Sequence, residues 1–433
     1  MESKILNFSN KTFCVYGLGT TGTSLLRWFK KNNLKNFEAW DDNEALMPFK
    51  KRKDVKNSFL KKLDSSDFIL ISPGINFKKT KLKRHLIRNK HKIITDLDLF
   101  YLLNPKVNSI IITGTNGKST TCKILEHVFK KNKINVELGG NIGRPVLNLS
   151  LRKDPVVIIE ASSFQLFYSK FIKPKYAAII NLTKDHLEWH GTMSNYINSK
   201  LKIFSSQKKN NYSFLNSKFL IKKFKRKKFK GKLNIVNFKN YKKIKNKIQN
   251  NYLNLEINNE NMSFVYTICK KFKINDQSFT KALKSFKGLP HRHEIFLKRE
   301  NKIFINDSKA TSFEASKYAL KNNKNIYWIL GGLPKVKDKF KLEAVKKNIT
   351  KAFIIGKHMK VFEKFLIGKV AYKLSKNLKN ALSLIFKEIQ KNKKKKITVL
   401  FSPASASFDQ FKNFEDRGLK FKNLVKSHEN KYS

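Results

Sequence analysis

The residues best suited to chemistry follow a short apolar segment, in the run S-I-I-I-T-G-T-N-G-K-S-T-T at 109–121. The β-branched residues predict a strand, the glycines predict a turn, and the apolar spacing over 122–129 predicts a helix. A turn that opens a helix directs backbone N–H groups and the positive helix end at an anion. Lys118 would reach the outer phosphates of a nucleotide, and the hydroxyl of Ser119 or Thr120 would hold Mg²⁺.

This run departs in one position from the phosphate-binding pattern G-x-x-x-x-G-K-[ST]. The pattern requires Gly where the chain has Ile112, although the G-K-S-T ending is intact. A plain strand–turn–helix connection would explain the glycines, but not a lysine and two hydroxyls at the start of a helix. The sequence therefore predicts a nucleotide site here.

Three further polar groups follow predicted strands of the same region. Glu160 ends the apolar run V-V-I-I, His186 follows A-A-I-I-N-L-T-K-D, and Asn141 lies among three glycines. For Glu160 the alternative is an exposed acid at a strand end, and of Asp185 and His186 either one alone is more often structural than functional. The ends of parallel strands converge on one edge of a sheet, where a carboxylate beside a phosphate loop can bind Mg²⁺.

A second glycine turn lies near the start of the chain, where T-F-C-V-Y runs into G-L-G-T-T-G at 17–22. About twenty residues later, Asp41 and Asp42 end a second predicted strand, and Ser72 ends a third. A G-x-G-x-x-G turn followed at this spacing by an acid is typical of nucleotide-type ligands. The alternative is a tight turn that needs glycine only for packing.

Composition limits the remaining possibilities. The formal net charge of +61 taken alone favours nucleic acid or an anionic membrane. The lysines are spread over the whole chain together with many Asn, Ile and Phe, and Arg is scarce, a mixture typical of AT-rich coding. Nucleic-acid readers favour Arg, so we expect no specific nucleic-acid partner. Three scattered cysteines and no apolar run of membrane-spanning length predict a cytoplasmic protein that inserts into no membrane.

Strands and helices alternate along the chain, which predicts an α/β fold with parallel sheets in three domains. We expect a Rossmann-like domain over 1–104, a central P-loop ATPase-type domain over 105–296, and a Rossmann-like domain over 297–433. The basic stretch 207–250 is interpreted as surface strands and loops of the central domain.

With these blocks in hand, the chain resembles the Mur ligases over nearly its whole length. The blocks that carry the resemblance include G-L-G-T-T-G-T-S at 17, T-G-T-N-G-K-S-T at 113, E-A-S-S-F-Q-L at 160, N-L-T-K-D-H at 181, G-L-P-H-R at 288, N-D-S-K-A-T at 306 and S-P-A-S-A-S-F-D-Q-F at 402. The final block is most similar to the family member that adds D-glutamate. The resemblance implies that ATP activates the carboxylate of UDP-N-acetylmuramoyl-L-alanine as an acyl phosphate, which the amine of D-glutamate attacks during peptidoglycan precursor synthesis.

The resemblance also implies roles for single residues. Glu160 with Ser119 or Thr120 would hold one Mg²⁺, and His186 would help to hold a second with Lys200, which aligns with a carbamylated lysine of the family. The ATP site would comprise Gly114, Thr115, Asn116, Gly117, Lys118, Ser119, Thr120, Asn261, Arg292 and Asp307, with Asn258 a further adenine-side residue. The UDP substrate would meet Gly17, Leu18, Gly19, Thr20, Thr21, Asp41, Asp42, Ser72 and Asn141.

For D-glutamate, which carries two carboxylates, the resemblance implies a site of cations and hydroxyls. Its residues would be Lys309, Thr311, Lys335, Ser407 and Phe408, with Ser405 an alternative to Ser407. We expect a monomer. Two other interpretations stay open, namely a sister ligase that adds another amino acid and a nucleotide- or nucleic-acid-binding protein without ligase activity.

Overall fold

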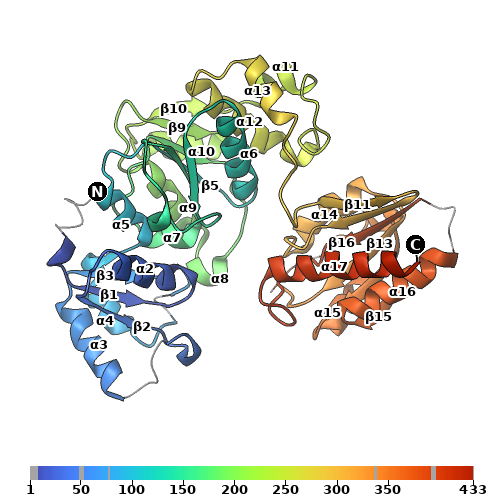
Figure 1. The fold of residues 1–433 in the computed structure, drawn as a ribbon, viewed down its shortest axis with the longest axis horizontal. Coiled ribbons are helices and arrows are strands. Elements are labelled where there is room, and N and C mark those ends of the chain that lie inside the picture. Colours follow the sequence, from blue (N-terminus) through green and yellow to red (C-terminus); the bar gives the residue numbers. More distant parts are fainter. Residues whose placement is uncertain are drawn as a thin grey trace. The chain divides into compact units, whose positions relative to one another are not determined.

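A computed structural model describes residues 8–47, 53–76, 79–335, 338, 340–391 and 396–432. The chain divides into two compact units, Met1–Phe286 and Lys287–Ser433. The first unit contains two sheets and the second contains one, each with helices packed on it (Figure 1). The predicted α/β class with parallel sheets is confirmed, while the boundaries at 104/105 and 296/297 stay predictions.

The first sheet has four parallel strands in the order β2-β1-β3-β4. They are β1 (Phe13–Tyr16), β2 (Phe37–Trp40), β3 (Phe68–Ile71) and β4 (Ile93–Ile94). Helices α2 (Thr20–Lys31), α3 (Lys53–Ser65) and α4 (Lys83–Arg88) connect them, and α5 (Asp96–Leu103) follows β4. All of β1 is buried: Phe13 and Val15 join one apolar cluster, while Cys14 and Tyr16 join another. A strand covered on both faces needs this continuous apolar run, which is why the sequence pattern was clear.

The second sheet has six parallel strands in the order β10-β9-β8-β5-β7-β6. They are β5 (Ser109–Thr113), β6 (Val136–Gly140), β7 (Val156–Glu160), β8 (Tyr176–Ile179), β9 (Tyr212–Leu215) and β10 (Lys232–Ile235). The main helices are α6 (Lys118–Lys131), α7 (Ser163–Tyr168), α8 (Leu187–His190), α9 (Met193–Leu201), α12 (Asn259–Lys271) and α13 (Asp276–Leu283). Ile112 of β5 is in register with Glu160 of β7, and Thr113 with Ile179 of β8, so these three strands end at one edge.

The basic stretch 207–250 differs from the expectation of strands and loops. Besides β9 and β10 it forms two helices, α10 (Lys218–Arg226) and α11 (Phe238–Lys245). Each buries one residue pair at helical spacing, Leu220 with Phe224 and Tyr241 with Ile244. Lysines occupy most other positions, so only a thin apolar stripe marks each helix in the sequence.

The second unit has one sheet in the order β11-β12-β16-β13-β14-β15, in which β11 runs antiparallel to β12 and the other pairs are parallel. Its strands are β11 (Glu294–Arg299), β12 (Lys302–Asn306), β13 (Ile326–Gly331), β14 (Ile349–Ile355), β15 (Tyr372–Lys376) and β16 (Ile397–Phe401). Helices α14 (Phe313–Asn322), α15 (Met359–Leu366), α16 (Leu378–Lys391) and α17 (Phe414–Tyr432) accompany them. Strands β11 and β15 lie at the two edges of the sheet, and most of their residues are half-buried or exposed. Strand β15 has no apolar run, whereas β11 carries I-F-L and was not predicted.

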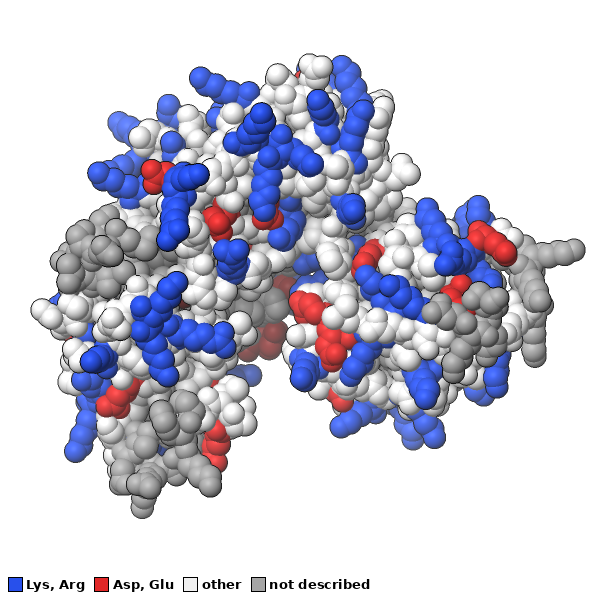
Figure 2. Space-filling model, viewed as in Figure 1, with Lys and Arg blue, Asp and Glu red and all other residues white. Residues whose placement is uncertain are grey.

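Lys and Arg side chains are distributed over the face in Figure 2, on both units, with few Asp or Glu among them. They do not gather on one element, which agrees with their even spread along the chain. Among the described residues, no helix is long and apolar enough to cross a membrane.

Candidate active site

Residues 114–117, the segment predicted to bind a nucleotide and called the nucleotide loop below, connect β5 to α6 at the carboxyl edge of the second sheet. Gly117 has φ +79°, and a Cβ atom there would lie 2.0 Å from Oδ1 of Asn261. Glycine is therefore required twice over, by the left-handed backbone and by the contact. This contact places Asn261, which belongs to α12, directly against the predicted phosphate site.

Asn181, which follows β8, holds the nucleotide loop from the side. Its Oδ1 accepts hydrogen bonds from the backbone N–H groups of Thr115 at 3.1 Å and Asn116 at 2.9 Å. The Thr115 hydroxyl lies 2.9 Å from the hydroxyl of Tyr196. Lys118 Nζ donates to the carbonyls of Gly114 at 3.0 Å and Thr115 at 2.9 Å, so its ammonium group lies over the loop.

Glu160 ends β7 beside the nucleotide loop and is buried. Its Oε1 accepts a hydrogen bond from Asn141 Nδ2 at 3.1 Å. Its Oε2 is buried and has no hydrogen-bond partner among the described residues. A buried carboxylate oxygen without a donor is costly unless a cation or another donor meets it. Ser119 and Thr120, in the first turn of α6, are also buried.

These oxygen atoms fit Mg²⁺, which binds oxygen ligands and usually takes several of them from water molecules or substrate phosphates. One carboxylate and one hydroxyl supply a typical protein share of such a site. No group of three or more His, Cys, Asp or Glu side chains that could hold a metal occurs in the described part of the chain. A site made by the protein alone is therefore not seen there, whereas a site shared with nucleotide phosphates needs fewer protein ligands.

Lys200, on α9, is 2% exposed despite its charge. Its Nζ donates to the carbonyl of Gly114 at 2.8 Å and to the Thr113 hydroxyl at 3.4 Å, and it lies 4.7 Å from the ring centre of Tyr196. Burial lowers the pKa of Lys200 well below its ordinary value, and the charge of Lys118 lowers it further. The carboxylates of Asp185 and Glu160 act in the opposite direction. The lysine predicted from the resemblance thus lies against the nucleotide loop.

His186 caps α8 with a left-handed backbone, φ +52°. Its Nε2 lies 3.3 Å from Oδ2 of Asp185, and its Nδ1 lies 3.7 Å from Oε1 of Glu188. Its ring centre is 4.7 Å from that of Phe164, the residue that opens the F-Q-L part of the block after β7. The segments that follow β7 and β8 therefore come into contact, although β5 lies between these two strands in the sheet.

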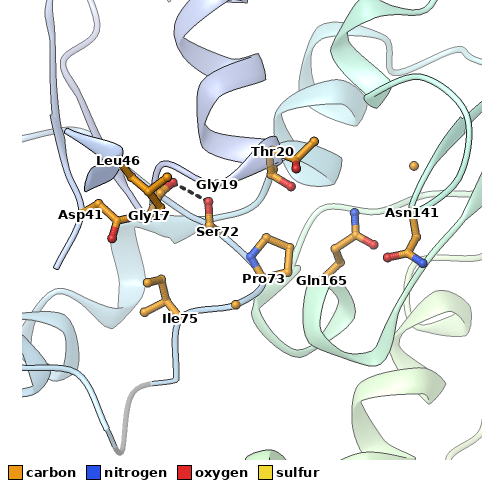
Figure 3. A pocket seen from close by; sticks show the side chains of 13 residues that line it. Gly17, Gly19, Thr20, Asp41, Leu46, Ser72, Pro73, Ile75, Asn141 and Gln165 are labelled. Carbon is orange, nitrogen blue, oxygen red and sulfur yellow. Dashed lines mark hydrogen bonds between the residues drawn. The ribbon is translucent and has the colours of Figure 1, made fainter. Parts of the chain in front are cut away.

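A pocket of about 510 Å³ in the first unit spans the carboxyl ends of the first sheet and the end of β6 (Figure 3). Ser72 lies at its centre, where its hydroxyl donates to the carbonyl of Gly17 at 2.6 Å. Gly17 has φ +94°, and a Cβ atom there would lie 2.7 Å from Ser72 Cβ. The predicted residues that line the pocket are Gly17, Gly19, Thr20, Thr21, Asp41, Ser72 and Asn141.

Two residues of the predicted UDP set are placed differently. Leu18 is buried in the core of the first sheet, so only its backbone is near the turn. Asp42 accepts hydrogen bonds from Tyr16 at 2.6 Å and from Trp40 at 3.1 Å, away from the pocket lining. Asp41 lines the pocket, although its carboxylate accepts from the N–H groups of Leu18 at 2.6 Å and Asn43 at 2.7 Å.

The pocket also has lining residues that were not predicted from the sequence. They are Leu46, Pro73, Gly74, Ile75, Gly140 and Gln165. Gln165 comes from α7 and lies beside Asn141 on the side of the pocket away from Asp41 (Figure 3). The residues S-P-G at 72–74 directly follow β3, so their place at a strand end is a signal for Pro73 and Gly74. Leu46 has no local signal, because an isolated leucine is ordinarily interpreted as a core residue.

Part of the predicted ATP set lies in the second unit. Asp307 follows β12, accepts from the Ser402 hydroxyl at 2.7 Å and from the His293 N–H at 3.0 Å, and has a pKa raised to about 7 by burial. Those two hydrogen bonds and the charge of Arg292 hold the pKa lower than burial alone would. Arg292 lies between two residues of positive φ, His291 and His293, in the turn before β11.

The predicted D-glutamate residues come from three segments of the second unit. Two of these segments meet through Leu333 and Ala406, whose backbones exchange hydrogen bonds of 3.0 Å, which brings the stretches containing Lys335 and Ser407 together. Lys309 Nζ lies 3.7 Å from the ring centre of Phe414. Thr311, Lys335 and Phe408 are exposed, whereas Ser407 is buried. The alternative, Ser405, donates its buried hydroxyl to the Gly331 carbonyl at 2.7 Å.

Comparison with known proteins identifies the family of this chain. Residues 112–283 match the Mur ligase middle domain. The chain is 33% identical to the UDP-N-acetylmuramoylalanine–D-glutamate ligase of a Wolbachia species from Brugia malayi, and 32% identical to that of Rickettsia felis, in each case over 96% of both chains. The fold is similar to that of the UDP-N-acetylmuramate–alanine ligase of Thermotoga maritima, with a TM-score of 0.55, 17% identity and coverage of 97% of this chain and 100% of that one.

A second crystal structure, the MurF ligase of Thermotoga maritima in complex with ADP, matches with a TM-score of 0.54 and 14% identity over 97% of this chain and 99% of that one. These structural matches support the fold alone, while the identity to the curated relatives extends over nearly the full length. This chain belongs to the Mur ligase family, in the branch of the UDP-N-acetylmuramoylalanine–D-glutamate ligases.

Proposed function

We propose that this chain uses ATP to join D-glutamate to UDP-N-acetylmuramoyl-L-alanine, as a cytoplasmic monomer acting in peptidoglycan precursor synthesis. The observation that carries the proposal is the convergence of the nucleotide loop, Glu160 and Lys200 at one edge of the second sheet. Membership of the family that carries this activity supports the choice of substrates.

In the first step, a carboxylate oxygen of the UDP substrate attacks the γ-phosphorus of ATP, the bond to the β-phosphate oxygen breaks, and ADP leaves. Phosphoryl transfer needs positioning and charge neutralisation more than covalent help. Lys118 and the first-turn N–H groups of α6 would supply both, with Asn261 at the adenine side. The pocket around Ser72 would hold the UDP sugar, and Asn141 would connect it to Glu160.

Glu160 with Ser119 or Thr120 would hold Mg²⁺, and His186 with a carbamylated Lys200 would hold a second ion. When bound, such ions neutralise the two anions that must approach each other. The burial of the Lys200 amine against the Gly114 carbonyl supports its place beside the phosphates.

In the second step, the amine of D-glutamate attacks the acyl carbon and loses a proton. The tetrahedral intermediate collapses, the bond to the phosphate oxygen breaks, and the amide and inorganic phosphate leave. Lys309, Thr311, Lys335, Ser407 and Phe408 would receive D-glutamate, while Arg292 and Asp307 would contact ATP. We further propose that residues 1–104, 105–296 and 297–433 act as three domains.

The test is phosphate release from ATP with Mg²⁺ and UDP-N-acetylmuramoyl-L-alanine, adding D-glutamate, L-glutamate, L-alanine or no amino acid. Release that requires D-glutamate and is lost in Lys118→Ala supports the proposal, with Lys131→Ala at the far end of the same helix as the matched control. Release with another amino acid would assign the chain to a sister ligase. If no amino acid causes phosphate release, the alternative of a nucleotide- or nucleic-acid-binding protein without ligase activity is favoured.

A further inference from the structure

Glu260, in the first turn of α12, lies behind the nucleotide loop and has no part in the mechanism above. Its Oε2 accepts a hydrogen bond from Asn181 Nδ2 at 2.6 Å, and its Oε1 accepts one from Asn216 Nδ2 at 2.8 Å. Asn181 and Asn216 follow the neighbouring strands β8 and β9. One carboxylate thus receives two amide groups from two adjacent strand ends.

The chemistry of a carboxylate makes this arrangement directional. An ionised carboxylate only accepts hydrogen bonds, whereas a side-chain amide presents an acceptor on one side and donors on the other. With its NH₂ group directed at Glu260, Asn181 must direct Oδ1 away from it. That oxygen then accepts from both loop N–H groups, those of Thr115 and Asn116.

We infer that Glu260 is a positioning residue for the nucleotide loop, which it orients through Asn181. Without an acceptor-only group at this position, the Asn181 amide could turn over and present its NH₂ group to the N–H groups of Thr115 and Asn116. Two donors cannot bond to each other, so the loop would leave its ATP-binding conformation for part of the time. The measured nucleotide affinity falls by the fraction of molecules in which the loop is displaced.

Helix α12 contacts the nucleotide loop at a second point, so its first turn fixes the loop in two places. Asn261, the next residue, lies against Gly117 so closely that a Cβ atom could not be placed there. Its Oδ1 also accepts from the Thr121 hydroxyl at 3.4 Å. The first turn of α12 therefore contacts one end of the loop directly and the other end through Asn181.

Glu260→Gln is the informative change because it keeps the shape and removes the acceptor-only property. The amide introduced by this substitution can accept from one asparagine, but its NH₂ group then faces the NH₂ group of the other. One of the two asparagines must therefore turn over, and in the molecules where Asn181 turns over the loop loses its acceptor. Asn216→Asp added to it restores the pattern, since the amide of residue 260 can donate to the new carboxylate and accept from Asn181. Asn216→Asp alone places two carboxylates face to face and should also weaken binding.

The assay is calorimetric titration of the full chain with ADP and Mg²⁺. We expect Kd to rise about two- to tenfold in Glu260→Gln, which corresponds to a displaced loop in about half to nine tenths of the molecules, and to return to the original value in the double variant. The matched control is Glu256→Gln, because Glu256 is exposed four residues earlier on the chain. Hydrogen exchange of the peptide containing Thr115 and Asn116 should speed up in Glu260→Gln, whereas peptides of the second unit should not change.

This inference rests on the assignment of the loop to ATP, and the two can fail separately. If the unmodified chain binds no ADP, the proposed function fails. If it binds ADP and Glu260→Gln binds as tightly, or the double variant recovers nothing, the role of Glu260 is refuted. If Glu260→Gln does not fold, the comparison of Asn216→Asp with the double variant decides. Weaker ADP binding by Asn216→Asp that is restored in the double variant supports the role of Glu260, and equal ADP binding by these two variants refutes it.

Discussion

Gly117→Ala tests whether the nucleotide loop is built as the structure shows. A non-glycine residue at φ +79° costs about 1–2 kcal/mol. The added Cβ atom would lie 2.0 Å from Asn261 Oδ1, so Asn261 must move, and overpacking of this kind costs about 1–3 kcal/mol more. We therefore expect the free energy of unfolding of the first unit to fall by about 2–5 kcal/mol.

The two contributions can be separated in an Asn261→Ala background. Removing the amide makes room for the methyl group but leaves the left-handed backbone unchanged, so the cost of Gly117→Ala should shrink to about 1–2 kcal/mol. The matched control is Gly19→Ala, because Gly19 has φ −63° and no atom lies within 4 Å of the Cβ position. Because Gly19 is the N-cap residue of α2, where alanine is less favourable than glycine, this control should cost no more than about 1 kcal/mol.

Urea unfolding followed by tryptophan fluorescence measures this change. The chain has four tryptophans, of which only Trp328 lies in the second unit, so a Trp328→Phe background for every variant makes the signal report the first unit. An unchanged midpoint in Gly117→Ala would contradict the loop geometry. If Gly117→Ala lowers the free energy of unfolding equally with and without the Asn261 amide, the contact with Asn261 is not the cause of the destabilisation.

Three further outcomes are expected. The pKa of Asp307 is raised from 3.8 to about 7, so between about pH 4 and pH 7 the folded chain keeps a proton on this carboxyl group that the unfolded chain has already lost. The free energy of unfolding should therefore fall as the pH rises through that window, and Asp307→Asn should flatten this slope in a pH series of thermal unfolding. Lys200→Met should leave the melting temperature unchanged or raised, because it removes a buried amine, and should abolish phosphate release; a large fall in melting temperature would contradict the first expectation. Chelation by EDTA should stop phosphate release and excess Mg²⁺ should restore it, whereas full activity in EDTA would contradict the assignment of Glu160 as a metal ligand.

Much of the fold was predictable because parallel strands buried on both faces leave continuous apolar runs. Strands β5 and β7 are of this kind, and their positions follow from the sequence alone. Helices α10 and α11 were missed because lysines surround a narrow apolar stripe, and the edge strand β15 because it has no apolar run and buries only Ser375. The strength of a local pattern depends on how much of an element is buried.

The sequence by itself determined the nucleotide loop, since a strand, a glycine turn and a helix with Lys118 at its start are all local features. It also determined the family, through blocks whose order and residue types are written in the chain. It did not separate Asp41, which lines the pocket, from Asp42, which bonds inward to Tyr16. Beyond the resemblance, nothing in it distinguished Lys200 among 92 Lys and Arg residues.

Only the tertiary structure decided those points, because burial and charge at a residue come from neighbours far away in the chain. Lys200 differs from the other lysines through the carbonyl of Gly114 and the ring of Tyr196, which the fold brings to it. Glu260 gains its place only when α12 meets the ends of β8 and β9. The free-energy cost of removing a charged group from water depends on these neighbours, and no local sequence pattern specifies them.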